Sequence, residues 1–169
     1  RSDARSLHEH FELERPLAKL VAGPVHFAHT GWGSVDFLEE ESRFGETEDS
    51  FVMFYEHQNS FEADAWLEAK GEAEFPVCVM NAGYSSGWTA ASFDFDLVAS
   101  EILCRARGDE CCRFVMAAPS RITDVIGAYA DQCPEIAPRV DDYDIPGFFE
   151  RKRIEAELHK KDQQLARAD

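Results

Sequence analysis

Side chains of the kinds that bind metal ions recur with a compact spacing in the middle of the chain. Cys78, Glu101, Cys104 and Cys112 follow the pattern C-x22-E-x2-C-x7-C. Three thiolates and one carboxylate can close a tetrahedral Zn²⁺ site that leaves no coordination position for water. The spacing therefore indicates a structural zinc site. The alternatives are that Cys111 takes the fourth position, or that the thiols are simply buried, since cysteine is among the most buried residue types.

A β-hairpin would bring three of these ligands together. The segments 97–106 and 112–117 flank a short turn, so Cys104 and Cys112 stand roughly level with each other on opposite arms. Glu101 lies three residues before Cys104, and on a regular strand this separation points the two side chains to opposite faces. A β-bulge is therefore required if both are to bind one ion.

The rest of the chain predicts an antiparallel sheet with packed helices, an α/β fold of the α+β kind. A continuous apolar run marks a buried strand that would carry Cys78. Ser60, with Glu62 in the first turn and Gly71 as the stop, is typical of a capped helix. The expected order is a short helix at 16–21, a turn at Gly23-Pro24, a hairpin of strands at 34–38 and 51–55, a helix at 60–70, a buried strand at 75–80, a helix carrying Trp88 and Phe93, the hairpin above, and a helix that Ser120 caps and Pro134 ends.

The C-terminal segment differs in kind from the rest. Residues 148–169 contain no Pro or Gly and consist largely of strong helix formers. With Ile154 at heptad position d, Leu158 and Leu165 fall at a, and Lys161 places a charge at the intervening d position. We expect a dimeric coiled-coil linker helix, and the alternative is a solvated helix at the chain end.

Composition excludes several classes of function. The chain has 169 residues, enough for one domain, and its 33 acidic against 17 basic residues give a net charge of −16. A chain with this much negative charge repels phosphate backbones and anionic membrane surfaces. Five cysteines, an odd number, and no visible signal peptide favour a reducing cytoplasm. No serine-hydrolase elbow, phosphate loop or His-Glu-x-x-His pair occurs, so nothing here requires an enzyme.

Several motifs carry a resemblance to a known family. They are PVC at 76–78, GYSSGW at 83–88, E-x-x-C at 101–104 and G-x-x-x-C at 108–112. With this spacing, residues 20–118 resemble the 4-vinyl-reductase-type domain, in the version found in the sensor halves of xylene- and phenol-responsive bacterial transcription activators. The resemblance implies an α+β sensor domain, usually dimeric, that encloses a mostly apolar pocket.

The same resemblance implies roles for particular residues. Cys78, Glu101, Cys104 and Cys112 correspond to the ligands of a structural zinc ion, which leaves Cys111 outside the site. It also implies a ligand pocket, for which we expect the residues Phe27, Phe54, His57, Tyr84, Trp88 and Phe93. The alternative is that these side chains simply fill the core.

The sequence departs from the phenol-sensing pattern at two positions. Phe27 stands where that pattern has a histidine, and His57 stands where it has a tryptophan. The polar partner for a phenol hydroxyl is therefore not where the family places it, although His57 could supply one from the other wall. We expect a small apolar or aromatic ligand and leave its identity open.

These observations predict a division of the chain and a function. The division is a leader at 1–20, a zinc-containing ligand-sensing domain at 21–135, a connector at 136–147 and a signalling helix at 148–169. The last segment resembles linkers that enter sensor histidine kinases. The leading interpretation is a cytoplasmic sensory input domain that passes ligand occupancy to an output domain such as a histidine kinase. The alternatives are a structural zinc dimerisation module without ligand, and a reductase-like enzyme subunit.

Overall fold

The structure is a computed structural model that describes residues 2–133 and 136, with five further helical positions at 154, 157, 158, 161 and 164. The expected connector at 136–147, apart from its first residue, lies outside the described residues. So does most of the expected signalling helix at 148–169, including Leu165. The description therefore covers almost all of the expected sensing domain.

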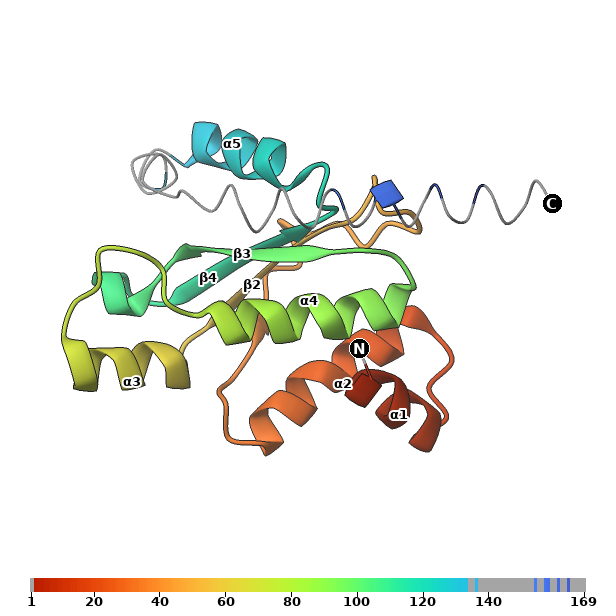
Figure 1. The fold of residues 1–169 in the computed structure, drawn as a ribbon, viewed down its shortest axis with the longest axis horizontal. Coiled ribbons are helices and arrows are strands. Elements are labelled where there is room, and N and C mark those ends of the chain that lie inside the picture. Colours follow the sequence, from red (N-terminus) through yellow and green to blue (C-terminus); the bar gives the residue numbers. More distant parts are fainter. Residues whose placement is uncertain are drawn as a thin grey trace.

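In the described part of the chain, four strands form one antiparallel sheet in the order β1-β2-β4-β3. Both expected hairpins, β1 with β2 and β3 with β4, are confirmed, and so is the α+β fold class (Figure 1). The strands are β1 (Asp36–Phe37), β2 (Val52–His57), β3 (Val98–Leu103) and β4 (Cys112–Ala117).

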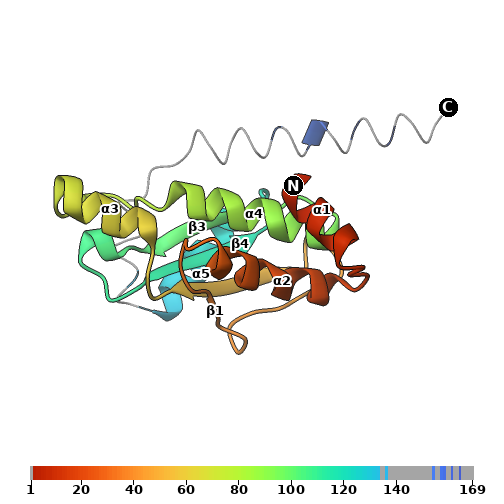
Figure 2. The same ribbon diagram turned by 90° about the horizontal axis from the view of Figure 1, so that it is seen from below.

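Helices cover the two faces of the sheet unequally. The first four lie on one face and α5 lies on the other (Figures 1 and 2). The boundary expected at residue 20 falls inside α2, and Ala4 of α1 is buried against Trp88 of α4. The helices are α1 (Ser2–His10), α2 (Pro16–His29), α3 (Phe61–Lys70), α4 (Val79–Phe93) and α5 (Ile122–Gln132), with the 3₁₀ turn η1 (Arg105–Arg107) between β3 and β4.

Side chains along residues 51–55 alternate between two cores. Phe51, Met53 and Tyr55 point to the face that α2 and α4 cover, whereas Val52 and Phe54 point to the face that α5 covers. All five are 5% exposed or less. Because both faces are covered, the strand appears in the sequence as an unbroken apolar run rather than as an alternation.

Helix α2 is longer than the sequence predicts, and the turn expected at Gly23-Pro24 is wrong. The helix continues through both residues because it packs closely on α4: a Cβ added to Gly23 would lie 2.6 Å from the indole Nε1 of Trp88. That indole donates a hydrogen bond of 2.8 Å to the carbonyl of Lys19. The hydrogen bond therefore joins α2 to α4 one residue before Leu20, the residue whose carbonyl has no helical donor because Pro24 lacks a backbone N–H.

The strand expected at 75–80 is also wrong. Phe75 and Met80 are exposed, and helix α4 already begins at Val79, with Cys78 as its N-cap residue. Only Val77 and Cys78 of the run are buried. The run is therefore a loop that delivers Cys78 to the sheet.

Two local expectations are confirmed. Ser60 is the N-cap of α3 and accepts a hydrogen bond from the amide of Ala63, and Gly71 ends the helix with a φ of 80°. The pairing of β3 with β4 shifts register between Glu101 and Leu103, which is the β-bulge that the ligand spacing requires.

Candidate metal centre and ligand cavity

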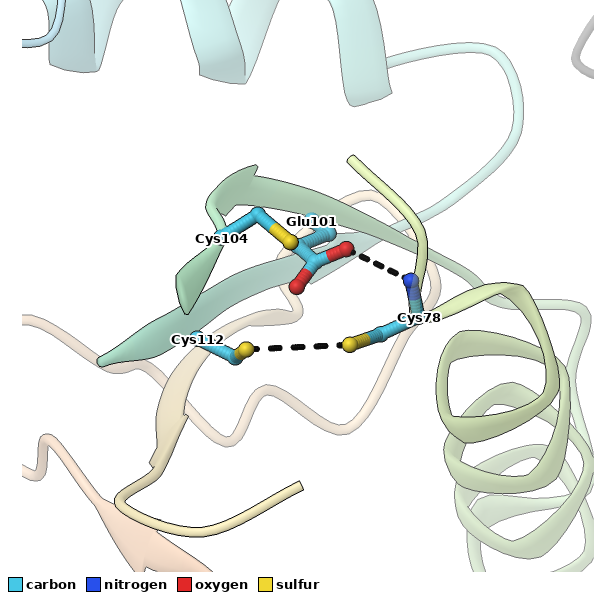
Figure 3. A group of neighbouring side chains, drawn as sticks. All are labelled: Cys78, Glu101, Cys104 and Cys112. Atoms are coloured by element: carbon cyan, nitrogen blue, oxygen red, sulfur yellow. Dashed lines mark hydrogen bonds between the residues drawn. The ribbon is translucent and has the colours of Figure 1, made fainter. Parts of the chain in front are cut away.

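Three structural elements bring the four candidate ligands together. Cys78 caps α4, Glu101 lies in β3, Cys104 follows β3 beyond the bulge, and Cys112 begins β4. Their ligand atoms all lie within 4.8 Å of one another (Figure 3). All four side chains are buried. The sequence therefore identified a cluster whose geometry could hold one metal ion.

The cluster is held by backbone donors as well as by its own side chains. The amide of Cys78 donates to Glu101 Oε2 at 2.8 Å, and the sulfurs of Cys78 and Cys112 are 3.6 Å apart (Figure 3). The amide of Arg105 donates to the Cys112 sulfur at 3.4 Å. Such donors stabilise thiolates and fix their direction before any cation arrives.

The protonation of the cluster also favours a cation. Hydrogen bonds from the thiols of Cys112 and Cys78 lower the pKa of Cys104, and the bonds with Cys104 raise the pKa of both donors. Burial, with the charge of Cys104 as the next cause, raises the pKa of Glu101 to about 8. A divalent cation among these groups would favour their ionised forms, because cysteine binds a metal as the thiolate.

One oxygen of the cluster lacks a partner. Glu101 Oε1 is buried and accepts no hydrogen bond, although the other carboxylate oxygen does. A buried acceptor without a donor is rare, and a cation bound by the cluster would satisfy this oxygen. Three sulfurs and one oxygen at this spacing fit tetrahedral Zn²⁺ with a closed coordination shell.

Cys111 lies outside the cluster, in agreement with the choice of Cys112 as ligand. Burial, with Glu56 as the next cause, raises the pKa of Cys111 to about 11, so it stays a thiol.

Two arginines near the cluster form ion pairs with carboxylates that are not candidate ligands. Arg105 pairs with Asp64 at 2.6 Å, and Arg113 pairs with Glu56 at 2.5 Å.

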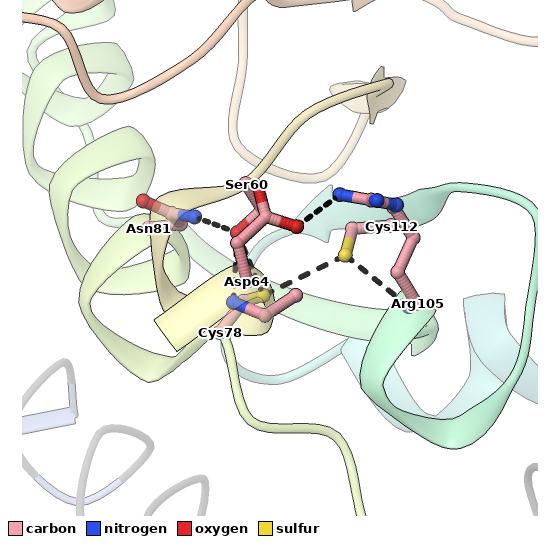
Figure 4. A network of polar contacts seen from close by, with 7 residues as sticks. Ser60, Asp64, Cys78, Asn81, Arg105 and Cys112 are labelled. Carbon is pink, nitrogen blue, oxygen red and sulfur yellow. Dashed lines mark hydrogen bonds and ion pairs between the residues drawn. The ribbon is translucent and has the colours of Figure 1, made fainter. Parts of the chain in front are cut away.

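A polar network joins the cluster to the helices on its face of the sheet (Figure 4). The Ser60 hydroxyl lies 3.1 Å from the Cys78 sulfur and accepts a 2.8 Å hydrogen bond from the side-chain amide of Asn81. Ser60 caps α3 and Asn81 lies in the first turn of α4. Hydrogen bonds therefore connect the start of each helix to the same candidate ligand, Cys78.

Glu62 of α3 caps the N-terminus of α4. Its carboxylate accepts hydrogen bonds from the backbone amides of Met80 and Asn81 at 2.8 and 2.7 Å. We expect Glu62→Gln to lower the free energy of unfolding by about 1–3 kcal/mol, since the amide side chain keeps one acceptor and loses the charge at the helix N-terminus. Urea denaturation measures this. Glu68→Gln, at an exposed position of the same helix α3, is the control and should change stability by less than about 0.5 kcal/mol. Equal losses in the two variants would contradict the capping role.

An apolar cavity lies between α2, α4 and the first two strands of the sheet. Its volume is about 30 Å³, which is room for roughly one or two water molecules. A larger ligand therefore needs side chains to move. The lining residues are Leu20, Gly23, Pro24, Phe27, Val35, Phe37, Met53, Tyr55, Tyr84, Ser85, Trp88 and Thr89.

The structure brings three of the six expected pocket residues together. Phe27, Tyr84 and Trp88 line the cavity. The Phe27 and Tyr84 rings are 5.4 Å apart, and the hydroxyl of the half-buried Tyr84 lies 2.6 Å from His26 Nδ1. Tyr84 therefore stands between the cavity and the protein surface.

Two expected pocket residues, Phe54 and Phe93, do not line this cavity. Phe54 points to the opposite face of the sheet, where its ring contacts Tyr129 at 4.5 Å. Phe93, at the end of α4, packs on Phe51 at 4.9 Å. Strand alternation and helix length separate both from the residues that line the cavity.

His57 lies behind the cavity wall rather than in it. Its ring is 5.0 Å from those of Phe27 and Phe114, and the residue is 0% exposed. Neither ring nitrogen has a hydrogen-bond partner. Burial lowers the pKa of His57 to about 4, so the ring is neutral near pH 7.

The sequence reasoning missed the residues that form the floor of the cavity. Met53 and Tyr55 belong to the apolar run that predicted β2, and Phe37 belongs to β1. Strand alternation groups the odd positions of that run on one face, but the run is apolar throughout, so the sequence does not show on which face the cavity lies. Pro24 was missed because the sequence predicts a turn there rather than a helix lying along the sheet.

The fold is similar to that of a solved sensory domain. The crystal structure of the phenol-responsive sensory domain of the transcription activator PoxR with phenol matches with a TM-score of 0.62 and 22% sequence identity. The match covers 76% of this chain and 62% of that chain. At this identity the likeness is one of fold, and it confirms the expected α+β architecture.

A sequence relative points to the same class of proteins. The phenol regulator MopR of Acinetobacter guillouiae is 30% identical over 95 residues, which are 56% of this chain and 17% of that protein. The chain thus spans about a sixth of the length of MopR. No protein-family model matches the chain. The expected resemblance to the sensor region of phenol-responsive regulators is confirmed, and both matched proteins are regulators rather than enzymes.

None of the helices in the described residues is long and apolar enough to cross a membrane.

Proposed function

We propose that this chain is a sensory input domain that binds a small apolar or aromatic molecule in the cavity between α2, α4 and the sheet. The apolar cavity carries the proposal: its lining holds aromatic rings with a few neutral polar groups, the usual composition of a small-molecule site. The solved domain of the same fold was determined with phenol, which supports a ligand of this size and kind.

We further propose that the Cys78, Glu101, Cys104 and Cys112 cluster holds a structural Zn²⁺ ion. Because all four coordination positions come from the protein, such an ion supplies stability and not hydrolysis. Its thiolates must stay reduced, which fits the cytoplasm. Cys78 joins the ion to α4, whose next turns supply one wall of the cavity.

Transmission of the signal through the C-terminal segment completes the proposal. Ile154 and Leu158, one helical turn apart, are 47% and 56% exposed. Apolar side chains in this position favour pairing with a second copy of the chain in a parallel coiled coil. A ligand that binds one conformation of the domain more tightly would then shift the conformational equilibrium of an attached output domain, such as a histidine kinase.

The zinc-loaded chain should gain stability from ligands that fill the cavity. At a ligand concentration a hundredfold above Kd, we expect about 2.7 kcal/mol of stabilisation, because the ligand binds only the folded state. For a chain of this size the melting temperature should rise by about 5–10 °C. Thermal denaturation with toluene, phenol and indole measures the rise, and a native mass spectrum reports zinc and the mass of the dimer.

The main alternative is a zinc-containing dimerisation module without ligand, which the small cavity volume favours. It predicts zinc and a dimer in the native spectrum, together with an unchanged melting temperature for every probe. That combination would contradict the sensory proposal while leaving the metal centre in place.

A further inference from the structure

The Ser60 hydroxyl lies where the starts of two helices meet the candidate metal centre (Figure 4). Its oxygen is 2.8 Å from the side-chain nitrogen of Asn81, 3.5 Å from the backbone nitrogen of Ala63 and 3.1 Å from the sulfur of Cys78. Ser60 and Asn81 are 0% exposed and Cys78 is 1% exposed. Bulk water therefore does not compete for these contacts.

The numbers of donors and acceptors fix the direction of the contact between Ser60 and Cys78. A serine hydroxyl has two acceptor lone pairs and one proton to donate. The N–H groups of Asn81 and Ala63 can only donate, so together they occupy both lone pairs of the oxygen. The proton of Ser60 is left to point at the Cys78 sulfur, which accepts it.

The side chain of Asn81 is arranged to hold Ser60 in this direction. Its nitrogen donates to the Ser60 oxygen, whereas its Oδ1 is buried and has no hydrogen-bond partner among the described residues. A buried amide that is paired at one end alone costs free energy. The bond to Ser60 is thus the contact that this buried amide makes with its side chain.

The three sulfurs of the cluster receive hydrogen bonds from different kinds of donor. Cys78 receives one from the side chain of Ser60. The other two sulfurs receive them from backbone groups, which are those of Arg105 for Cys112 and of Val77 and Ala106 for Cys104. The donor to Cys78 can therefore be removed by a substitution that leaves the backbone in place.

We propose that Ser60 is a positioning residue of the metal centre, whose hydroxyl donates a hydrogen bond to the metal-bound thiolate of Cys78 while Asn81 holds that hydroxyl in the donating direction. This inference rests on the proposed zinc site. Glu101, Cys104 and Cys112 belong to one hairpin, whereas Cys78 comes from the residue before α4. Ser60 and Asn81 fix the sulfur of the ligand that the hairpin does not hold.

Ser60→Ala tests the proposal with two measurements on the metal-loaded chain. Competition with a chromogenic chelator should show zinc affinity lower by about 10–100-fold, the usual effect of losing a group that orients a metal ligand. The chain loaded with Co²⁺ reports on the sulfur directly. Its sulfur-to-metal charge-transfer absorption should move to longer wavelength, because a thiolate without a hydrogen-bond donor releases its electrons more easily.

Asn81→Leu tests the second half of the proposal and keeps the hydroxyl that caps α3. Without the amide, the Ser60 hydroxyl is free to turn, so zinc affinity should fall by less than in Ser60→Ala and the absorption should shift in the same direction. Combined with Ser60→Ala, it should lower the affinity no further, because both substitutions act on one hydrogen bond.

Ser92→Ala is the matched control, since it removes the same atom from another buried serine. Ser92 is 4% exposed, and its hydroxyl donates to the carbonyl of Trp88 at 3.0 Å within α4. It should change neither the zinc affinity nor the Co²⁺ absorption.

Separate results would overturn the inference and the metal site beneath it. If Ser60→Ala keeps both the zinc affinity and the absorption, Ser60 caps α3 and does nothing for the metal. Should Ser60→Ala fail to fold, unchanged values in Asn81→Leu would refute the proposal equally. An Asn81→Leu loss that is as large in the Ser60→Ala chain as in the natural one would show that Asn81 does not act through Ser60. If the natural chain binds neither Zn²⁺ nor Co²⁺, the inference fails together with the proposed metal centre.

Discussion

Cys104→Ser should lose the bound zinc and leave the chain largely unfolded. Structural zinc sites contribute about 10–16 kcal/mol of apparent binding free energy, and the whole folding stability of a domain is about 5–15 kcal/mol. Serine keeps the shape of the side chain but is a poor zinc ligand, and the three remaining groups would be left crowded and partly charged. Metal analysis of the purified variant, with circular dichroism on heating, measures both effects.

Cys111→Ser is the control for this substitution. Cys111 is the sequence neighbour of a candidate ligand, is 9% exposed and lies outside the cluster. It should keep one zinc per chain and lose less than about 1.5 kcal/mol of stability. Stoichiometric zinc in Cys104→Ser, or its loss in Cys111→Ser, would contradict the assignment of the ligands.

Phe27→Ala should lower the free energy of unfolding by about 3–5 kcal/mol, because it removes a buried ring and leaves a space behind. The ring is 1% exposed and contacts Trp32, His57 and Tyr84 at centroid distances of 5.0–5.6 Å. The new space adjoins the existing cavity, so an apolar bicyclic molecule should enter it. We expect indole or naphthalene to restore several degrees of the lost melting temperature.

Phe54→Ala provides the comparison, because Phe54 is 4% exposed and packs on the opposite face of the sheet. Its loss of stability should be similar, and neither bicyclic molecule should restore it. Equal recovery in the two variants would mean that the aromatic molecules bind elsewhere and that the cavity beside Phe27 is not a ligand site.

The metal cluster could be predicted because most of it is local in sequence. Glu101, Cys104 and Cys112 belong to one hairpin, and the spacing itself demanded the bulge that the strands contain. Cys78 was placed on the wrong kind of element, since the apolar run around it predicts a strand. The run is instead a loop before a helix whose first amides are capped by Glu62, a contact between segments that spacing does not reveal.

The cavity was harder to predict, because it depends on which face each ring occupies. The run at residues 51–55 is apolar at every position, so nothing in the sequence distinguished Phe54 from Tyr55. Their faces were decided by α5 on one side and by α2 and α4 on the other. Helix α2 could not be traced through Pro24 from the sequence, because the close packing of Gly23 on Trp88 is a tertiary contact.

The position of Cys78 in the chain has a consequence for the order of folding. The ligands from β3 and β4 assemble with their hairpin, a contact of short sequence separation, whereas Cys78 lies 34 residues from Cys112. Short loops close faster than long ones, so we expect the sheet to present a half-formed site before α4 docks. If the cluster holds zinc as proposed, capture of the ion would fix the helical wall as a late step. The supply of zinc in the cell would therefore set how many newly made chains acquire a finished cavity.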